Sequence, residues 1–143
     1  MRESFSGIQE DFTNNLEIPD LDKKLIIRAT DIVNKNLSNS EFTVENLATN
    51  LNLSRTHLHR KLKSITNQSA TEFIRSIRLK QAIALMKEDK YIVKEIGYAV
   101  GFNSHNYFTK SFKKQYGMSP SEFIKDNFES LKPSGEKKLL TKK

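Results

Sequence analysis

Residues 44–75 read VENLATNLNLSRTHLHRKLKSITNQSATEFIR, and residues 93–125 follow the same plan as VKEIGYAVGFNSHNYFTKSFKKQYGMSPSEFIK. The two copies align at an offset of 49 residues until Asn103 is inserted, and at an offset of 50 afterwards. Matched positions keep their chemistry rather than their identity, as Leu58 and Phe108 do. Each copy predicts a short helix, a tight turn and a longer basic helix, which is the helix-turn-helix plan.

Turn and cap residues recur at equivalent positions of the two copies. Asn52 and Gly101 stand in the predicted turns, and both residue types enter the left-handed backbone region at low cost. The remaining predicted boundaries are the N-caps Asp20, Thr43, Ser54 and Ser104, the C-caps Asn67 and Gly117, and the capping boxes Ser69–Glu72 and Ser119–Glu122.

The apolar periodicity predicts an all-α fold of about seven helices, in two helix-turn-helix subdomains joined by a long central helix. The helix expected over 70–87 is apolar on more than one face, so it should lie between two bodies. The other expected helices begin near residue 20 and cover about 44–50, 54–66, 92–100, 104–116 and 119–127. The expected organisation is a linker or arm (1–19), a first subdomain (20–67), a connecting helix (68–88), a second subdomain (89–127) and a basic, disordered tail (128–143).

Charge and composition narrow the class of function. The net charge is +7, and residues 41–126 carry +6 of it while residues 1–40 carry −2. A basic excess concentrated on the repeats suggests a polyanionic partner such as nucleic acid. The chain has no cysteine, and no apolar run approaches the roughly 20 residues that span a bilayer. No set of residues suggests a nucleophile with its base, paired acids or a phosphate loop, so we do not expect an enzyme.

Two groups of residues have alternative interpretations. Tyr107, Phe108 and Phe112 could form a stacking platform for bases, but their helical spacing favours a place in the core. His57 and His59 could suggest a metal site. Positions two apart point to different faces of a helix, and no third ligand is evident. We therefore expect no metal and no cofactor.

The second copy carries a specific resemblance. The run 96–102, IGYAVGF, is followed by Tyr107-Phe108, Phe112-Lys113-Lys114, Gly117, Pro120 and Phe123, and together these elements resemble the signature of AraC-family transcription regulators. Two positions depart from that signature, since Gly97 stands where the family usually has alanine and Asn52 where the first copy usually has glycine. The stretch 69–82, SATEFIRSIRLKQA, is similar to the connector in the DNA-binding ends of hybrid two-component regulators. The resemblance implies an output domain of a larger regulator, with a stand-alone regulator as the alternative.

The resemblance also implies which residues meet DNA. The longer helix of each copy would lie in a major groove, with Arg60 suited to guanine and Asn106 to adenine. The implied base-contacting residues are Arg55, Thr56, His59, Arg60, His105, Asn106 and Lys110. The implied phosphate-contacting residues are Thr43, Ser54, Lys63, Ser104, Lys113 and Lys114.

The expected function is therefore a sequence-specific, double-stranded-DNA-binding transcription regulator, either an activator or a repressor. The alternative is a protein-interaction module that docks RNA polymerase or another regulator domain. RNA polymerase is an expected partner in the first case too, and dimers would form through upstream domains. We expect no membrane contact by this segment and a cytoplasmic, nucleoid-associated location, or the cytoplasmic side of a membrane-anchored hybrid sensor.

Overall fold

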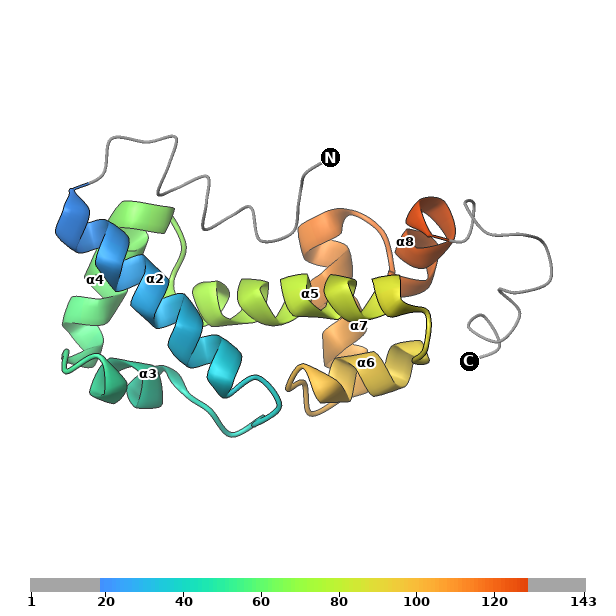
Figure 1. Cartoon of the computed structure of the whole chain (residues 1–143), viewed down its shortest axis with the longest axis horizontal. Coiled ribbons are helices and arrows are strands. Elements are labelled where there is room, and N and C mark those ends of the chain that lie inside the picture. Colours follow the sequence, from blue (N-terminus) through green and yellow to red (C-terminus); the bar gives the residue numbers. More distant parts are fainter. Residues whose placement is uncertain (1–18, 129–143) are drawn as a thin grey trace.

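The computed structural model describes residues 19–128, which form seven helices and no strand, as the sequence predicts. The arm expected over 1–19 and the tail expected over 128–143 lie outside the described residues, except for their innermost residue. Helix α5 runs along the long axis, with α2–α4 towards one end and α6–α8 towards the other (Figure 1). The helices are α2 (Asp20–Lys35), α3 (Val44–Asn50), α4 (Arg55–Thr66), α5 (Ala70–Glu88), α6 (Val93–Ala99), α7 (His105–Tyr116) and α8 (Pro120–Asn127).

Helix α5 belongs to two hydrophobic cores. Its first half contributes Phe73 and Ile77 to a core with α2, α3 and α4, which we call the first unit. Its second half contributes Leu79 and Ile83 to a core with α6, α7 and α8, the second unit. Only Arg78 separates the two sets of core residues along the helix. The connecting helix is therefore packed in both hydrophobic cores rather than exposed between them, as its several apolar faces predict.

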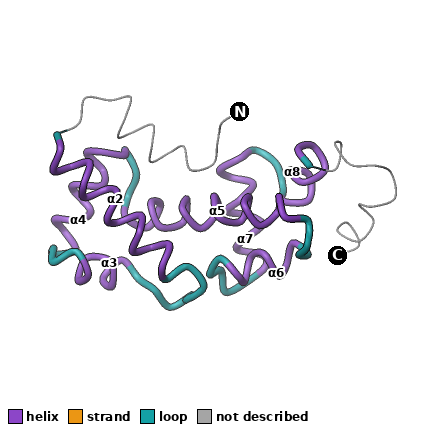
Figure 2. The backbone as a smooth tube through the Cα atoms, viewed as in Figure 1, coloured by secondary structure: helices purple, strands orange, loops and turns teal. Residues whose placement is uncertain are grey.

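The predicted left-handed residues lie where the chain turns. Asn52 and Gly101, in the turns of the two copies, have φ of 60° and 101°. Asn67 and Gly117, which end α4 and α7, have φ of 63° and 81°. Short loops thus connect the helices of each copy (Figure 2), and their geometry is set by residues that adopt positive φ at low cost.

Most predicted N-caps are confirmed. The hydroxyls of Ser54 and Ser104 accept hydrogen bonds from the third backbone N–H beyond them, at 3.0 Å and 2.9 Å. Thr43 forms a full capping box with Asn46, and the boxes at Ser69–Glu72 and Ser119–Glu122 are both formed. Asp20 is an exception: α2 begins at Asp20 itself, its N-cap is Pro19, and no side chain caps it.

The second correction concerns the aromatic residues of α7. Phe108 and Phe112 are fully buried, as expected, but Tyr107 is 49% exposed. The centroids of its ring and of the Phe102 ring are 5.4 Å apart in an edge-to-face arrangement, and its hydroxyl accepts from Arg75 at 3.3 Å. Position 107 follows the helix N-terminus by two residues, so it lies at the rim of the core, where a phenol can keep its hydroxyl in contact with water.

Gly97 has a packing role that helix propensity does not suggest. A Cβ at Gly97 would lie 2.7 Å from Cδ2 of Phe108, so α6 and α7 approach closely at this point. The first copy has Ala48 and Leu58 at the equivalent positions. The second copy therefore combines a larger core residue with a smaller partner, which keeps the volume of the pair similar.

Candidate nucleic-acid interface

The two longer helices of the copies, α4 and α7, are amphipathic in the same way. Leu58 and Leu62 on α4, and Phe108 and Phe112 on α7, are completely buried and fix each helix in its core. The opposite face of each helix is open to solvent. That open face carries every predicted base-contacting residue, all of them exposed: Arg55, Thr56, His59 and Arg60 on α4, and His105, Asn106 and Lys110 on α7.

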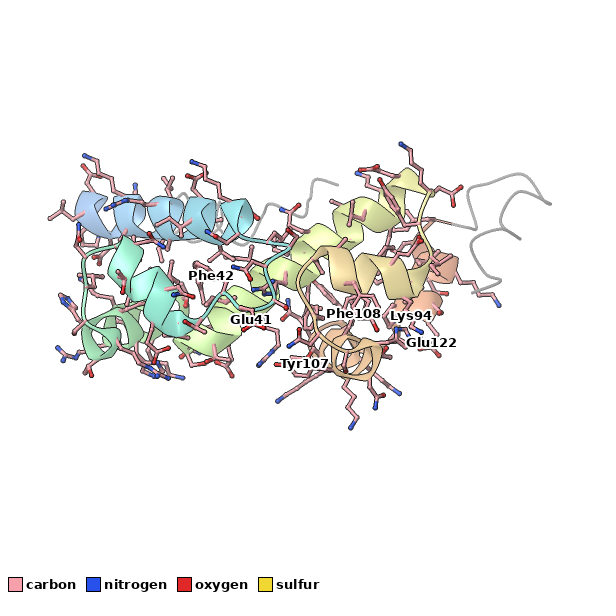
Figure 3. All side chains as sticks on the ribbon, turned by 90° about the horizontal axis from the view of Figure 1, so that it is seen from below. Glu41, Phe42, Lys94, Tyr107, Phe108 and Glu122 are labelled. Atoms are coloured by element: carbon pink, nitrogen blue, oxygen red, sulfur yellow. The ribbon has the colours of Figure 1, made fainter. Side chains whose placement is uncertain are left out.

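Both helices present their N-terminal ends at one edge of the molecule. In Figure 1, α4 and α7 run in a similar direction and begin at the lower edge of the view. Figure 3 looks onto that edge, with Tyr107 near the start of α7 and Glu41 and Phe42 of the first unit on the side towards α7. The fold therefore presents two similar, well-separated helix N-termini on the same side of the molecule, which is the arrangement that two recognition helices on one DNA face require.

Local contacts hold some of these side chains and leave others open. Arg55 forms a salt bridge with Glu45 of α3. His59 accepts a hydrogen bond at Nδ1 from the N–H of Ala70 at 3.5 Å, which turns its ring towards the start of α5. Among the described residues, no hydrogen bond or ion pair engages Arg60 or Lys110. The side chains of these two cations are therefore free to meet a ligand.

The predicted phosphate contacts fall into two groups. Thr43, Ser54 and Ser104 are N-caps whose hydroxyl oxygens accept from backbone N–H groups, and each hydroxyl can still donate its own O–H to a phosphate oxygen. The lysines Lys63, Lys113 and Lys114 are exposed in the last turns of α4 and α7. There they also interact favourably with the negative end of each helix dipole.

A cleft of about 250 Å³ lies between the two units. Phe42 and Thr43 line it from the first unit, and Asn103 and Tyr107 from the second, with Arg75 of α5 between them. Sequence reasoning did not bring these residues together, because no short-range pattern connects positions separated by some sixty residues along the chain.

Sequence reasoning also missed Arg78, which is only 7% exposed. Its guanidinium donates to the carbonyl oxygens of Leu37 (2.5 Å), Asn39 (3.2 Å) and Val100 (2.8 Å). Burial lowers the pKa of Arg78, although a guanidinium remains charged at neutral pH. The detectable signal was that Arg78 stands between two apolar residues, Ile77 and Leu79, in a helix that is apolar on more than one face.

No helix among residues 19–128 is both long and apolar enough to span a bilayer. Within that same range, no three histidine, aspartate or glutamate side chains are grouped so that they could hold a metal ion.

Comparisons with known proteins agree with this geometry. A family model described as a helix-turn-helix domain matches residues 47–126. The chain is 36% identical over 123 residues to histidine kinase P4 of Formosa agariphila, a match that covers 86% of this chain and 9% of the kinase. It therefore spans less than a tenth of that relative's length.

Two solved structures are similar in fold. The C-terminal domain of AraT, a response regulator from Geobacillus stearothermophilus, has a TM-score of 0.65 and 30% identity, with 72% of this chain and 85% of that domain covered. The DNA-binding domain of the global transcriptional factor AdpA, solved in complex with a target DNA, has a TM-score of 0.65 and 26% identity, with 82% and 100% covered. The chain belongs to the AraC-type helix-turn-helix family, a family of DNA-binding transcription-regulator domains and not of enzymes.

Proposed function

We propose that this chain binds a specific double-stranded DNA site by inserting α4 and α7 into successive major grooves of one DNA face. The observation that carries the proposal is the pair of amphipathic helices whose N-termini open at the same edge of the molecule. Two consecutive major grooves on one face lie about 34 Å apart, so the two half-sites would be separated by about one helical turn.

The exposed residues on the two helices suggest how each half-site is read. Arg60 can donate two hydrogen bonds to guanine O6 and N7, and Asn106 can pair with adenine in a bidentate manner. Lys110 can reach guanine or a phosphate, and Thr56 can offer its methyl group to thymine. Because the residues differ between the copies, each monomer would read a non-palindromic target.

The other predicted contacts have supporting roles in this proposal. His59 would use Nε2, because Nδ1 faces the Ala70 N–H. Arg55 would have to leave or share Glu45 to reach a base. The exchange has a low energetic cost, because exposed salt bridges contribute about 0–1 kcal/mol. His105 would complete the second reading head, and the caps and terminal lysines described above would contact the sugar–phosphate backbone.

In vitro selection of bound duplexes, followed by sequencing, tests the proposal. We expect two short motifs about one helical turn apart, and an affinity that falls steeply with added salt because phosphate contacts release counterions. Recovery of one motif would show that one of the two helices contacts only the backbone. Equal binding of selected and scrambled duplexes would refute sequence-specific recognition.

A double variant, Arg60→Ala with Lys110→Ala, tests the assignment of the reading residues. We expect loss of specific DNA binding with unchanged thermal stability, because both side chains are exposed and neither pairs with another residue of the range 19–128. The charge-matched control is Lys24→Ala with Lys90→Ala, which removes two exposed cations outside α4 and α7. Retention of DNA affinity in the Arg60→Ala, Lys110→Ala variant would refute the assignment of these two side chains as base-contacting residues. Intact binding of RNA polymerase by that variant would support the additional, protein-docking role.

We propose further that the chain acts as the DNA-binding output of a larger, two-component regulator. The likeness to part of a histidine kinase and to the C-terminal domain of a response regulator supports this role. In this role the domain would work in the cytoplasm, with dimers formed through other domains of the regulator. A reporter gene controlled by the selected site should respond to the phosphorylation state of the intact regulator, and an unresponsive reporter would contradict the proposal.

A further inference from the structure

Arg78 lies at the boundary between the two units. Ile77, on one side of it, packs in the core of the first unit, and Leu79, on the other side, packs in the core of the second. Leu37, in the loop between α2 and α3, contacts both cores. A buried charge at the boundary of two apolar cores is costly unless it is fully hydrogen-bonded, so the bonding of Arg78 shows what this position does.

The guanidinium of Arg78 joins the two units directly. Its Nη1 donates both to the Leu37 oxygen, 41 residues away in the first unit, and to the Val100 oxygen, 22 residues away in the second. Its Nη2 adds a bond to the oxygen of Asn39 at 3.2 Å. A planar group with several donors in fixed directions can hold separate carbonyls in one geometry, which a lysine ammonium on a flexible stem cannot do.

Gly101 shows how closely the second unit fits against this group. A Cβ at Gly101 would lie 1.4 Å from Nη1 of Arg78 and 2.3 Å from the Leu37 oxygen. The equivalent turn residue of the first copy, Asn52, carries a side chain and is exposed. Positive φ therefore does not by itself demand glycine in these turns. The close approach to Arg78 does.

We propose that Arg78 sets the distance and rotational phase between α4 and α7, and thereby selects the number of base pairs between the two half-sites. This inference rests on the proposed DNA-binding function. Helix α4 is fixed in the first core and α7 in the second, so the joint between the units determines where the second helix lies relative to the first. One base pair of spacer changes the separation by about 3.4 Å and the rotation by about a tenth of a turn. A rigid joint tolerates neither change well.

Binding to a series of selected sites whose spacer is shortened or lengthened by one base pair tests this role. For the natural sequence we expect about tenfold or greater weakening at each altered spacer, comparable to a mismatched base pair. In Arg78→Met the ratio between the best and the altered spacer should fall to about threefold or less. Arg78→Lys should lie in between, because an ammonium cannot bond all three carbonyls at once.

The ratio of DNA affinities at the best and the altered spacer distinguishes a positioning role of Arg78 from simple stabilisation of the fold. If Arg78 only stabilised the fold, its loss would weaken binding to every spacer equally and leave the ratio unchanged, which would overturn the proposal. Arg28→Met is the matched control. It removes an exposed arginine of α2 whose hydrogen bond goes to the Asn50 carbonyl within the first unit, so the spacer ratio should stay as in the natural sequence.

A second measurement needs no DNA. The chain has no cysteine, so spin labels can be placed at Ser64→Cys on α4 and Gln115→Cys on α7 without competing sites. Electron–electron double resonance should give a narrow distance distribution, which broadens or shifts in Arg78→Lys and more strongly in Arg78→Met. An unchanged distribution in both folded variants would overturn the proposal even if the natural sequence binds DNA specifically. Failure of DNA binding alone would leave this distance result standing.

Discussion

The turn at Gly101 provides a sharp test of how closely the second unit packs against Arg78 at the boundary between the two units. Gly101 and Gly117 both have positive φ, so replacing either by alanine forces the left-handed region on a residue with a Cβ. That change costs about 1–2 kcal/mol. Their surroundings differ: a Cβ at Gly117 meets no atom within 4 Å, whereas a Cβ at Gly101 overlaps the guanidinium of Arg78.

The difference between the two substitutions can be worked out from these contacts. Gly117→Ala should lower the free energy of unfolding by the backbone term alone, about 1–2 kcal/mol. Gly101→Ala must also displace Nη1 from at least one of the carbonyls of Leu37 and Val100. A hydrogen bond to a charged group contributes about 1.5–3 kcal/mol, so the total loss should be about 2.5–5 kcal/mol.

Urea denaturation followed by far-ultraviolet circular dichroism measures both losses on the same scale. Gly117→Ala serves as the internal control, because it carries the same backbone strain without the collision. We expect the midpoint of Gly101→Ala to fall well below that of Gly117→Ala. Equal losses in the two variants would refute the reasoning, since they would mean that Arg78 relaxes away from the turn without cost.

Three further predictions concern other parts of the fold. Gly97→Ala should destabilise the protein, because overpacking against Phe108 costs about 1–3 kcal/mol. The better helix propensity of alanine offsets at most about 1 kcal/mol of that cost. A variant that is more stable than the natural sequence in urea denaturation would contradict this. Hydrogen bonding from the Ser69 backbone N–H lowers the pKa of Glu72, so the stability linked to this carboxylate is present above its unfolded-state pKa and is lost as pH falls through the folded one. Denaturation from pH 7 down to pH 3 should therefore show a smaller loss for Glu72→Gln than for the natural sequence, and parallel curves would count against the link. Tyr107→Phe should change the melting temperature little, because the hydroxyl is at the half-exposed rim of the core, and a large drop would show that its hydrogen bond to α5 matters more than its exposure suggests.

Local rules allowed most of the fold to be predicted. Capping residues such as Ser69, and left-handed residues such as Asn67, act within four or five positions along the chain, so sequence alone locates their helix ends to within about one residue. Asp20 was misassigned because several residues near a helix start suit the role of N-cap. Tyr107 was misassigned because helical periodicity gives the direction of a side chain but not the depth of the core beneath it.

The candidate site was predicted in part. The exposed face of α4 and α7 follows from the same periodicity that buries Leu58 and Phe108, so the exposure of the proposed reading residues was foreseeable. The salt bridge of Arg55 and the hydrogen bond from Ala70 to His59 were not, because each joins separate helices. The roles of the reading residues in DNA binding remain predictions that the double variant tests.

The sequence by itself determined the two helix-turn-helix copies, their turns and the basic faces of their longer helices, because these features depend on contacts within a few residues. Only the tertiary structure decided how the two copies are joined. Arg78 reads in the sequence as one more charge on a helix, yet it is buried against carbonyl groups 41 and 22 residues away. A guanidinium donates to whichever acceptors the fold brings within about 3 Å of it. No periodicity along the chain predicts which carbonyl groups those will be.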